Sequence, residues 1–144
     1  MKKILVTLIA SVLIAAQVNA GPISELLIKK FNEAFPTATD VRWFEGKDFY
    51  QVTFKKDDIL CKIDYAADGT INRTLRYYQE KDLCPFIALR VNEKYKGRAI
   101  KGVVELQNND GLMYEIVMHD ATRWYIVNSD SDGNMKVKKT FRKA

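Results

Sequence analysis

The stretch FNEAFPTATDVRWFEGKDFYQVTF, residues 31–54, decides how this chain is built. Apolar residues at helical spacing lead into Pro36, which ends a helix because the residue before a proline is forced out of the helical region. Tyr50, Val52 and Phe54 then alternate with polar residues, which is the pattern of a half-buried antiparallel strand. The stretch therefore predicts a helix, a proline stop and two short strands joined by a turn.

Read in the same way, the whole chain predicts two helices and eight strands. Pro85 suits the first turn of a second helix, where its missing N–H is not required, and Gly97 is the stop of that helix. The Asp-Gly pairs at 68–69 and 132–133 suit tight turns, since glycine accepts the positive φ that a hairpin turn needs. The first helix is expected at residues 23–35, and the strands at residues 41–44, 49–54, 59–65, 70–77, 100–106, 112–118, 122–127 and 135–141.

The two halves of the chain share one outline. Helix positions repeat at an offset of 60 residues and strand positions at an offset of 64. The matched pairs are Phe31 with Val91, Phe35 with Tyr95, Tyr50 with Tyr114, Val52 with Ile116, and Phe54 with Met118. We expect a single α+β domain of two tandem repeats, about 21–80 and 81–144, each a helix followed by a four-stranded antiparallel meander. Joined edge to edge, the repeats would make one sheet with both helices on one face.

Residues 1–20 are unlike the rest of the chain. Lys2 and Lys3 precede an almost wholly apolar run at 4–16, and small residues close the segment. This is the pattern of a secretory signal peptide. A membrane anchor is the alternative, but the run is shorter than the about 20 apolar residues that a span needs. We expect a mature chain that begins at Gly21, has no membrane span, and is periplasmic or secreted.

The charge of the chain is mildly basic. The formal net charge is +5, and it falls to +3 when the two lysines of the leader are removed. Basic residues are scattered among acids except in the short tail at 136–143. A patch this short, in an exported protein, argues against a nucleic-acid partner.

The chain has two cysteines, Cys61 and Cys84. Export would place them where disulfides persist, and a bridge between them could contribute roughly 3 kcal/mol by the chain-entropy estimate. We therefore predict a disulfide, with two buried free thiols as the alternative.

A set of aromatic, small and turn residues in the first half resembles the exported PepSY-like family of Bacteroidetes, which is described as beta-lactamase-inhibitor-like. These residues are Phe35, Pro36, Ala38, Val41, Trp43, Tyr50, Val52, Phe54, Tyr65, Asp68 and Gly69. The resemblance covers nearly all of residues 21–144, and it departs from the pattern at Lys96, where the second half lacks the proline. It implies a fold like that of beta-lactamase inhibitor protein, with two helix-plus-four-strand repeats in one curved sheet. It carries over no inhibitory residue, because no inhibitor contact motif is matched.

The sequence offers little to catalysis or to metal binding. His119 is the single histidine, and neither the serine-hydrolase elbow nor the zinc-protease helix motif is present. Residues 128–133 resemble the start of a calcium loop, but the twelfth position is Lys139, where a bidentate Glu is needed. We expect a protein that is not an enzyme and has no catalytic residue, metal site or cofactor.

Aromatic residues fall on both faces of several predicted strands, so one set must face away from the helices. Exposed aromatics mixed with arginine are typical of binding hot spots. The residues predicted to bind on the helix-free face are Arg42, Phe44, Arg76, Tyr78, Arg123 and Trp124. The expected function is binding of an envelope or extracellular protein or peptide there, with inhibition of an envelope enzyme as a specific version. The alternative is a periplasmic carrier of a small ligand or ion in a cleft between the repeats.

Overall fold

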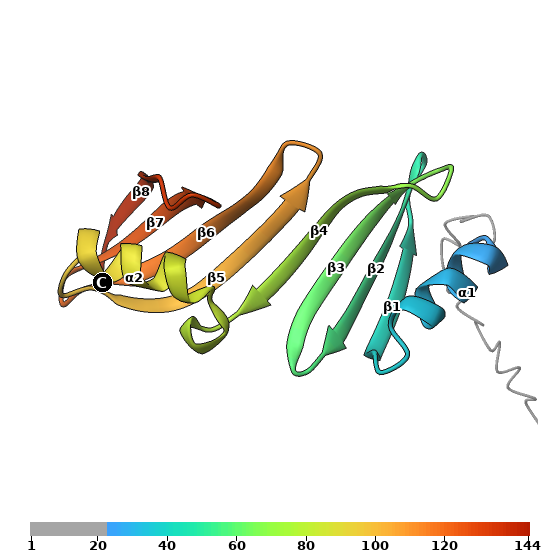
Figure 1. Cartoon of the computed structure of the whole chain (residues 1–144), viewed down its shortest axis with the longest axis horizontal. Helices are drawn as coiled ribbons and strands as arrows, with labels where there is room; N and C mark the ends of the chain where they lie inside the picture. The colour runs from blue at the N-terminus through green and yellow to red at the C-terminus, as the bar shows by residue number, and fades with distance from the viewer. Residues whose placement is uncertain (1–22) are drawn as a thin grey trace, which may run out of the picture.

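The fold is an open antiparallel sheet with two α-helices (Figure 1). The computed structural model describes residues 23–144, so the predicted signal peptide at 1–20 and the predicted start at Gly21 lie outside the described residues. The elements are α1 Glu25–Ala34, β1 Thr39–Glu45, β2 Phe49–Lys56, β3 Ile59–Ala66, β4 Ile71–Tyr78, a 3-10 turn Glu80–Asp82, α2 Pro85–Lys94, β5 Ala99–Asn108, β6 Gly111–His119, β7 Arg123–Asp130 and β8 Met135–Arg142. The predicted α+β class is confirmed. No helix within this range is long and apolar enough to cross a membrane.

The strands pair in the order in which they occur in the chain, from β1 to β8. Each neighbouring pair is antiparallel, including β4 with β5, which joins the two halves. β5 and β6 run further than predicted, because their pairing continues to Asn108 and Gly111 at the hairpin tip. The eight strands therefore form one continuous meander with free edges at β1 and β8.

Both helices end in the same way although their stop signals differ. The N–H of Phe35 donates to the carbonyl of Phe31 after α1, and the N–H of Tyr95 donates to the carbonyl of Val91 after α2. Pro36 prevents α1 from continuing. α2 lacks a proline there, and Gly97, with φ of 78°, turns the chain instead because glycine tolerates the left-handed region.

The first half has its own core beneath α1. Leu27 and Phe31 of α1 pack on strand residues of β2 and β3, and Trp43 of β1 packs against the same cluster. Phe31 is the centre of this core: its ring lies 5.4 Å from that of Trp43 and 5.0 Å from that of Phe54, both edge-on. The first half is therefore held by aromatic contacts, which favour this tilted geometry.

The second half has a separate core beneath α2. Ile87 and Val91 are each 1% exposed, and they pack on buried strand residues. The strand members are mainly aliphatic or sulfur-containing: Val103, Ile116, Met118, Val127 and Met135, with Tyr78, Tyr114 and Tyr125. Tyr78 comes from β4, so the last strand of the first half contributes to the core of the second.

Strand register separates the side chains of the sheet into two sets. Directly paired residues of antiparallel strands point to the same face, and sequence neighbours point to opposite faces. One row runs through Cys61, Arg76, Glu105 and Tyr114 on β3 to β6. This row continues the strand residues that pack against the helices, and we call its side of the sheet the packed face.

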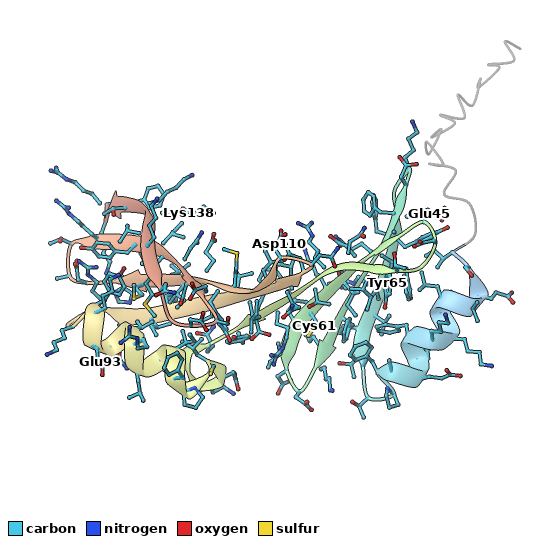
Figure 2. The ribbon with its side chains drawn as sticks, turned by 45° about the horizontal axis from the view of Figure 1, so that its top comes forward. Glu45, Cys61, Tyr65, Glu93, Asp110 and Lys138 are labelled. Atoms are coloured by element: carbon cyan, nitrogen blue, oxygen red, sulfur yellow. The ribbon has the colours of Figure 1, made fainter. Side chains whose placement is uncertain are left out.

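The second set of strand side chains points to the opposite face of the sheet, and its first row lies next to the row from Cys61 to Tyr114. That row runs through Leu60, Tyr77, Val104 and Glu115 on the same four strands. None of these four residues belongs to either core, and we call their side of the sheet the open face. In Figure 2 the labelled Lys138 lies at the upper side of the second half, and Glu93 of α2 lies at its lower side.

The predicted disulfide is not formed: Cys61 and Cys84 are both free. Cys61 lies on β3, three strands away from Tyr114 in its row, which is roughly 14 Å at the usual strand spacing. Cys84 caps α2 beside Tyr114, whose pKa is raised by burial first and then by Glu105 and Cys84. A bridge requires Cα atoms within about 7 Å, so the two thiols are too far apart.

Candidate functional site

The structure divides the six predicted binding residues between the two faces. Arg42, Phe44 and Trp124 lie on the open face, as predicted: Arg42 and Phe44 flank Trp43, which packs in the first core, and Trp124 precedes the buried Tyr125. Arg76, Tyr78 and Arg123 lie on the packed face, so their predicted placement is wrong. The error has one cause, since a strand's aromatic content does not say which of its two side-chain sets meets the helix.

Tyr78 and Arg76 instead form a hydrogen-bonded cluster with Glu105 where β4 meets β5. The Tyr78 hydroxyl donates to Glu105 Oε2 at 2.7 Å, and Arg76 Nη1 lies 3.1 Å and 3.3 Å from the two carboxylate oxygens. Burial, and then the bond to Glu105, raise the pKa of Tyr78 well above its usual value. Tyr78 is 6% exposed, so it stabilises the junction and is not available to a partner.

The centre of the open face is apolar and lacks a covering helix. Its members are half-buried or exposed, and each comes from a strand between β3 and β6: Leu60, Leu75, Tyr77, Val104, Leu106 and Met113. Met113 is 40% exposed. A shallow hollow of about 220 Å³ lies here, lined by Leu75, Val104, Leu106 and Met113 among others. In the sequence these residues alternate with the core residues, but only the pairing of the four strands β3 to β6 shows that they form one continuous surface.

One side of this hollow carries an unpaired acceptor. The side-chain oxygen of Asn128, Oδ1, is buried and has no hydrogen-bond partner among residues 23–144. Beside it, Lys138 Nζ donates to Glu115 Oε2 at 2.7 Å. A buried acceptor without a donor costs about 1–3 kcal/mol, so an N–H group from a binding partner or a water would gain from this position.

Charges around the apolar centre are mostly positive. Two acids of the open face are already engaged, Asp64 by Arg73 and Gln51, and Glu115 by Lys138. The cations of this face with no carboxylate of the described chain within 4 Å are Arg42, Lys62, Lys136, Lys139 and, at the end of the face, Lys143. The open face therefore combines an apolar centre with uncompensated positive charge on both sides.

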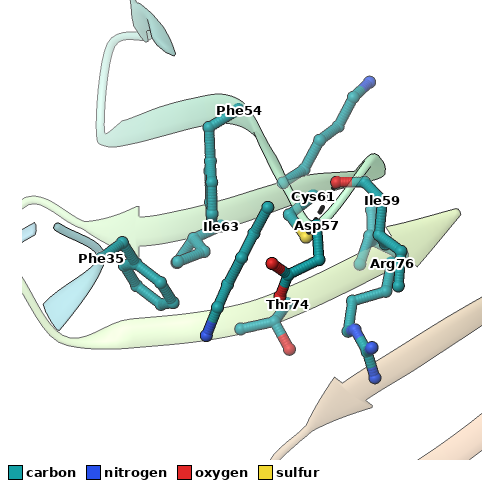
Figure 3. Close-up of a pocket in the computed structure, with 11 residues that line it drawn as sticks. Phe35, Phe54, Asp57, Ile59, Cys61, Ile63, Thr74 and Arg76 are labelled. Carbon is teal, nitrogen blue, oxygen red and sulfur yellow. Dashed lines mark hydrogen bonds between the residues drawn. The ribbon is translucent and has the colours of Figure 1, made fainter. Parts of the chain in front are cut away.

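A second hollow, of about 270 Å³, lies on the packed face (Figure 3). Phe35, Phe54 and Ile63 form its apolar side, and Arg76 lies at the opposite side. All of its lining residues belong to the first half, so it is not a cleft between the two halves. No local sequence pattern predicts this hollow, because its lining residues come from the end of α1 and from β2, β3 and β4.

In the acidic turn at 130–134, the carboxylate oxygens of Asp130 accept hydrogen bonds from the turn itself. Asp130 Oδ1 accepts from the backbone N–H groups of Asp132 and Asn134, and Oδ2 accepts from the Asn134 side chain. These bonds lower the pKa of Asp130, the Asn134 side chain having the largest effect. No group of His, Cys, Asp or Glu residues within 23–144 has an arrangement that could hold a metal ion.

His119 takes part in a small cluster at the end of the open face. Its ring lies 4.9 Å from that of Trp124, and Lys143 Nζ lies 3.1 Å from His119 Nδ1. The Lys143 ammonium also lies 5.1 Å from the Trp124 ring centre. The predicted binding residue Trp124 therefore packs between His119 and Lys143, with part of its surface still exposed.

Comparison with known proteins identifies the fold. No protein-family model matches the chain, and no curated protein matches its sequence. A BLIP-like protein from Bacteroides fragilis superposes with a TM-score of 0.67 at 15% identity, over 88% of this chain and 92% of the other. A DUF2874 family protein from Bacteroides uniformis gives 0.62 at 13%, over 84% and 90%.

A further structure, from Bacteroides eggerthii, carries a name that provisionally calls it periplasmic. It gives a TM-score of 0.62 at 12% identity, over 85% of this chain and 90% of the other. Identities this low show the fold alone. The chain therefore has the fold of the BLIP-like and DUF2874 proteins of Bacteroides.

Proposed function

We propose that this protein is an exported, PepSY-like binding module that uses its open face to bind another protein. In this proposal, each helix with its four strands is one of two tandem repeats, and both helices lie on the packed face. Three features support the architecture: the matched positions Phe31 and Val91, the matched helix ends, and the unbroken row from Cys61 to Tyr114. The name of the Bacteroides eggerthii neighbour supports a periplasmic location.

The observation that carries the proposal is the uncovered apolar centre of the open face. A sheet face that meets water usually alternates to polar residues, whereas this one places Leu75, Val104 and Leu106 side by side across β4 and β5. Contiguous exposed apolar surface rimmed by polar residues marks interaction sites.

The charge pattern supports one class of partner. Lys62 lies on one side of the apolar centre, and Lys136 and Lys139 lie on the other, without carboxylates of the described chain. The complementary partner is a protein with an apolar strip bordered by Asp or Glu side chains. Such pairing sets orientation and speeds association more than it adds affinity. Inhibition of an envelope enzyme that bears such a strip is the specific version of this function.

The proposed role is binding, without catalysis or a cofactor. The alternative, a carrier of a small ligand or ion between the repeats, needs a hollow lined by both halves on the packed face. The packed-face hollow is lined by the first half alone. The shallow open-face hollow does cross the junction, but its place in a broad surface suits a protein contact better than an enclosed ligand.

Charge reversal tests the proposed face against a matched control. The mature protein, immobilised, is used to recover partners from a periplasmic extract, in parallel with Lys136→Glu/Lys139→Glu and with Lys30→Glu/Lys96→Glu. All four lysines are exposed, so both double variants should fold, and both change the net charge equally. The expected result is an acidic protein whose binding weakens with salt, survives the control changes and is lost with the open-face changes.

Hydrogen exchange of the complex then locates the contact. Added protection on β4 to β7 at the open face supports the proposal. Equal loss of binding in both double variants, or protection confined to α1 and α2, would assign the interaction elsewhere.

A further inference from the structure

The packed-face hollow has the composition of a site for a small ligand, independent of the open face (Figure 3). Phe54 and Ile63 are 1% and 3% exposed, so the hollow reaches the core of the first half. Cys61 and Thr74 are the small residues of its floor, and larger side chains at these positions would fill it. The space is therefore a consequence of which residues pair across β3 and β4.

Cations lie around this apolar space. Lys56 and Arg76 both line the hollow, and both act on the pKa of the Cys61 thiol: burial raises it, and the two cations lower it. Lys56 Nζ also lies 5.8 Å from the Phe35 ring centre. Two positive side chains therefore approach one buried sulfur from two different strands.

Arg76 keeps binding capacity for a ligand. Its bonds to Glu105 use Nη1, and a guanidinium has five N–H donors. The side chain is 43% exposed, so the remaining donors are accessible. Asp57 is the acid that lines the hollow, and it lies in the exposed β2–β3 turn with φ of 50°.

We propose that this hollow binds a small carboxylate with an apolar body, such as a medium-chain fatty acid. The apolar body would lie on Phe35, Phe54 and Ile63, and the carboxylate would bind Arg76 and Lys56. The volume of about 270 Å³ is just below the about 300–1,000 Å³ of sites for drug-sized ligands, so the ligand is correspondingly small. The ligand would lie on the packed face, opposite the proposed protein contact, although Lys62 and Leu75 of the open face also line the hollow.

The Cys61 thiol provides a local reporter. In a Cys84→Ser variant of the mature protein, Cys61 is the single thiol, and its alkylation by iodoacetamide is followed by mass spectrometry with and without octanoate. One charged contact of about 1 kcal/mol corresponds to about five-fold in affinity, so we expect octanoate to protect Cys61 at concentrations about five-fold lower than octanol. Octanoate should also raise the Tm of the wild-type chain.

Two variants of the site and one control locate the binding. Lys56→Gln should remove most of the preference for octanoate over octanol, and Thr74→Phe should abolish protection by filling the hollow. Lys30→Gln, an exposed change on α1, should leave both unchanged. Equal protection by octanol would overturn the carboxylate class, and protection that survives Thr74→Phe would overturn the location. Absence of protection and of thermal stabilisation at millimolar octanoate would overturn the site itself.

Discussion

The two halves of this molecule share a backbone outline and differ in what holds it. Phe31 of α1 meets three other aromatic rings, those of Phe35, Trp43 and Phe54. The matched Val91 of α2 lies in a core of aliphatic, methionine and tyrosine side chains. Both positions are 1% exposed. The outline therefore depends on where apolar residues fall along the chain, while the choice of side chain only has to fill the space beneath each helix.

The largest expected effect comes from the matched helix positions. Phe31→Ala should lower the free energy of unfolding by about 3–5 kcal/mol, because it removes an aromatic ring from the centre of the first core. Val91→Ala removes two carbons and should cost about 1.6 kcal/mol. Urea unfolding of both variants measures the difference. Equal losses would show that the aromatic cluster gives the first half no greater dependence on its helix.

Tyr78 tests how strongly the halves are joined, since it lies on β4 and packs in the second core. Tyr78→Phe should cost about 1.5–3 kcal/mol, because it removes a hydroxyl that donates to the Glu105 carboxylate. One cooperative transition, shifted as a whole, indicates halves that unfold together. A second transition at lower denaturant in the variant would instead show that the halves separate.

The same residue gives the protein a pH dependence. The pKa of Tyr78 is raised in the folded state, chiefly by burial and then by the bond to Glu105. The neutral hydroxyl is therefore favoured by folding, and its contribution is complete below the unfolded pKa of about 10 and is lost as the pH rises above it. Denaturant unfolding between neutral pH and pH above about 10 should show a steeper loss in the wild type than in Tyr78→Phe.

A substitution in the β2–β3 turn of the first half should stabilise the protein, whereas the corresponding β6–β7 turn of the second half offers no such gain. Asp57 and Asp58 have φ of 50° and 62°, whereas the β6–β7 turn is held by Asp120, which accepts from the N–H groups of Thr122 and Arg123. Asp58→Gly should stabilise the fold by about 0.5–1 kcal/mol. Glycine removes the cost of a left-handed conformation, which is about 1–2 kcal/mol, but it adds a loss of backbone entropy on folding of about 0.5–1 kcal/mol. Thermal unfolding measures the gain, and a lower Tm would contradict the prediction.

The smallest expected effect is that of a reductant. Cys61 belongs to the first half and Cys84 to the second, and both are free, so dithiothreitol should leave the Tm unchanged. A cross-link between the halves would contribute roughly 3 kcal/mol, which is large enough to be seen. Mass spectrometry under non-reducing conditions should find two alkylatable thiols after denaturation, and a fall in Tm on reduction would show that the halves are covalently joined.

Much of the fold could be predicted from the sequence, because the signals for helices, strands and turns are local. Pro36, Pro85 and the Asp-Gly turns delimit the elements, and the alternation of Tyr50, Val52 and Phe54 identifies a strand with one buried face. Only half of the candidate binding surface could be predicted from the sequence. Arg42, Phe44 and Trp124 were placed on the correct face, while Arg76, Tyr78 and Arg123 were not.

The sequence by itself determined the helices, the strands and their antiparallel meander, since these follow from hydrophobic period and turn chemistry within a few residues of each position. Tertiary structure alone decided three other features: the distance that separates Cys61 from Cys84, the hydrogen bond from Tyr78 to Glu105, and the apolar surface shared by Leu75, Val104 and Leu106. Each of these depends on the register between β4 and β5. Register is set by the pairing of whole strands, so no local pattern in either strand contains it.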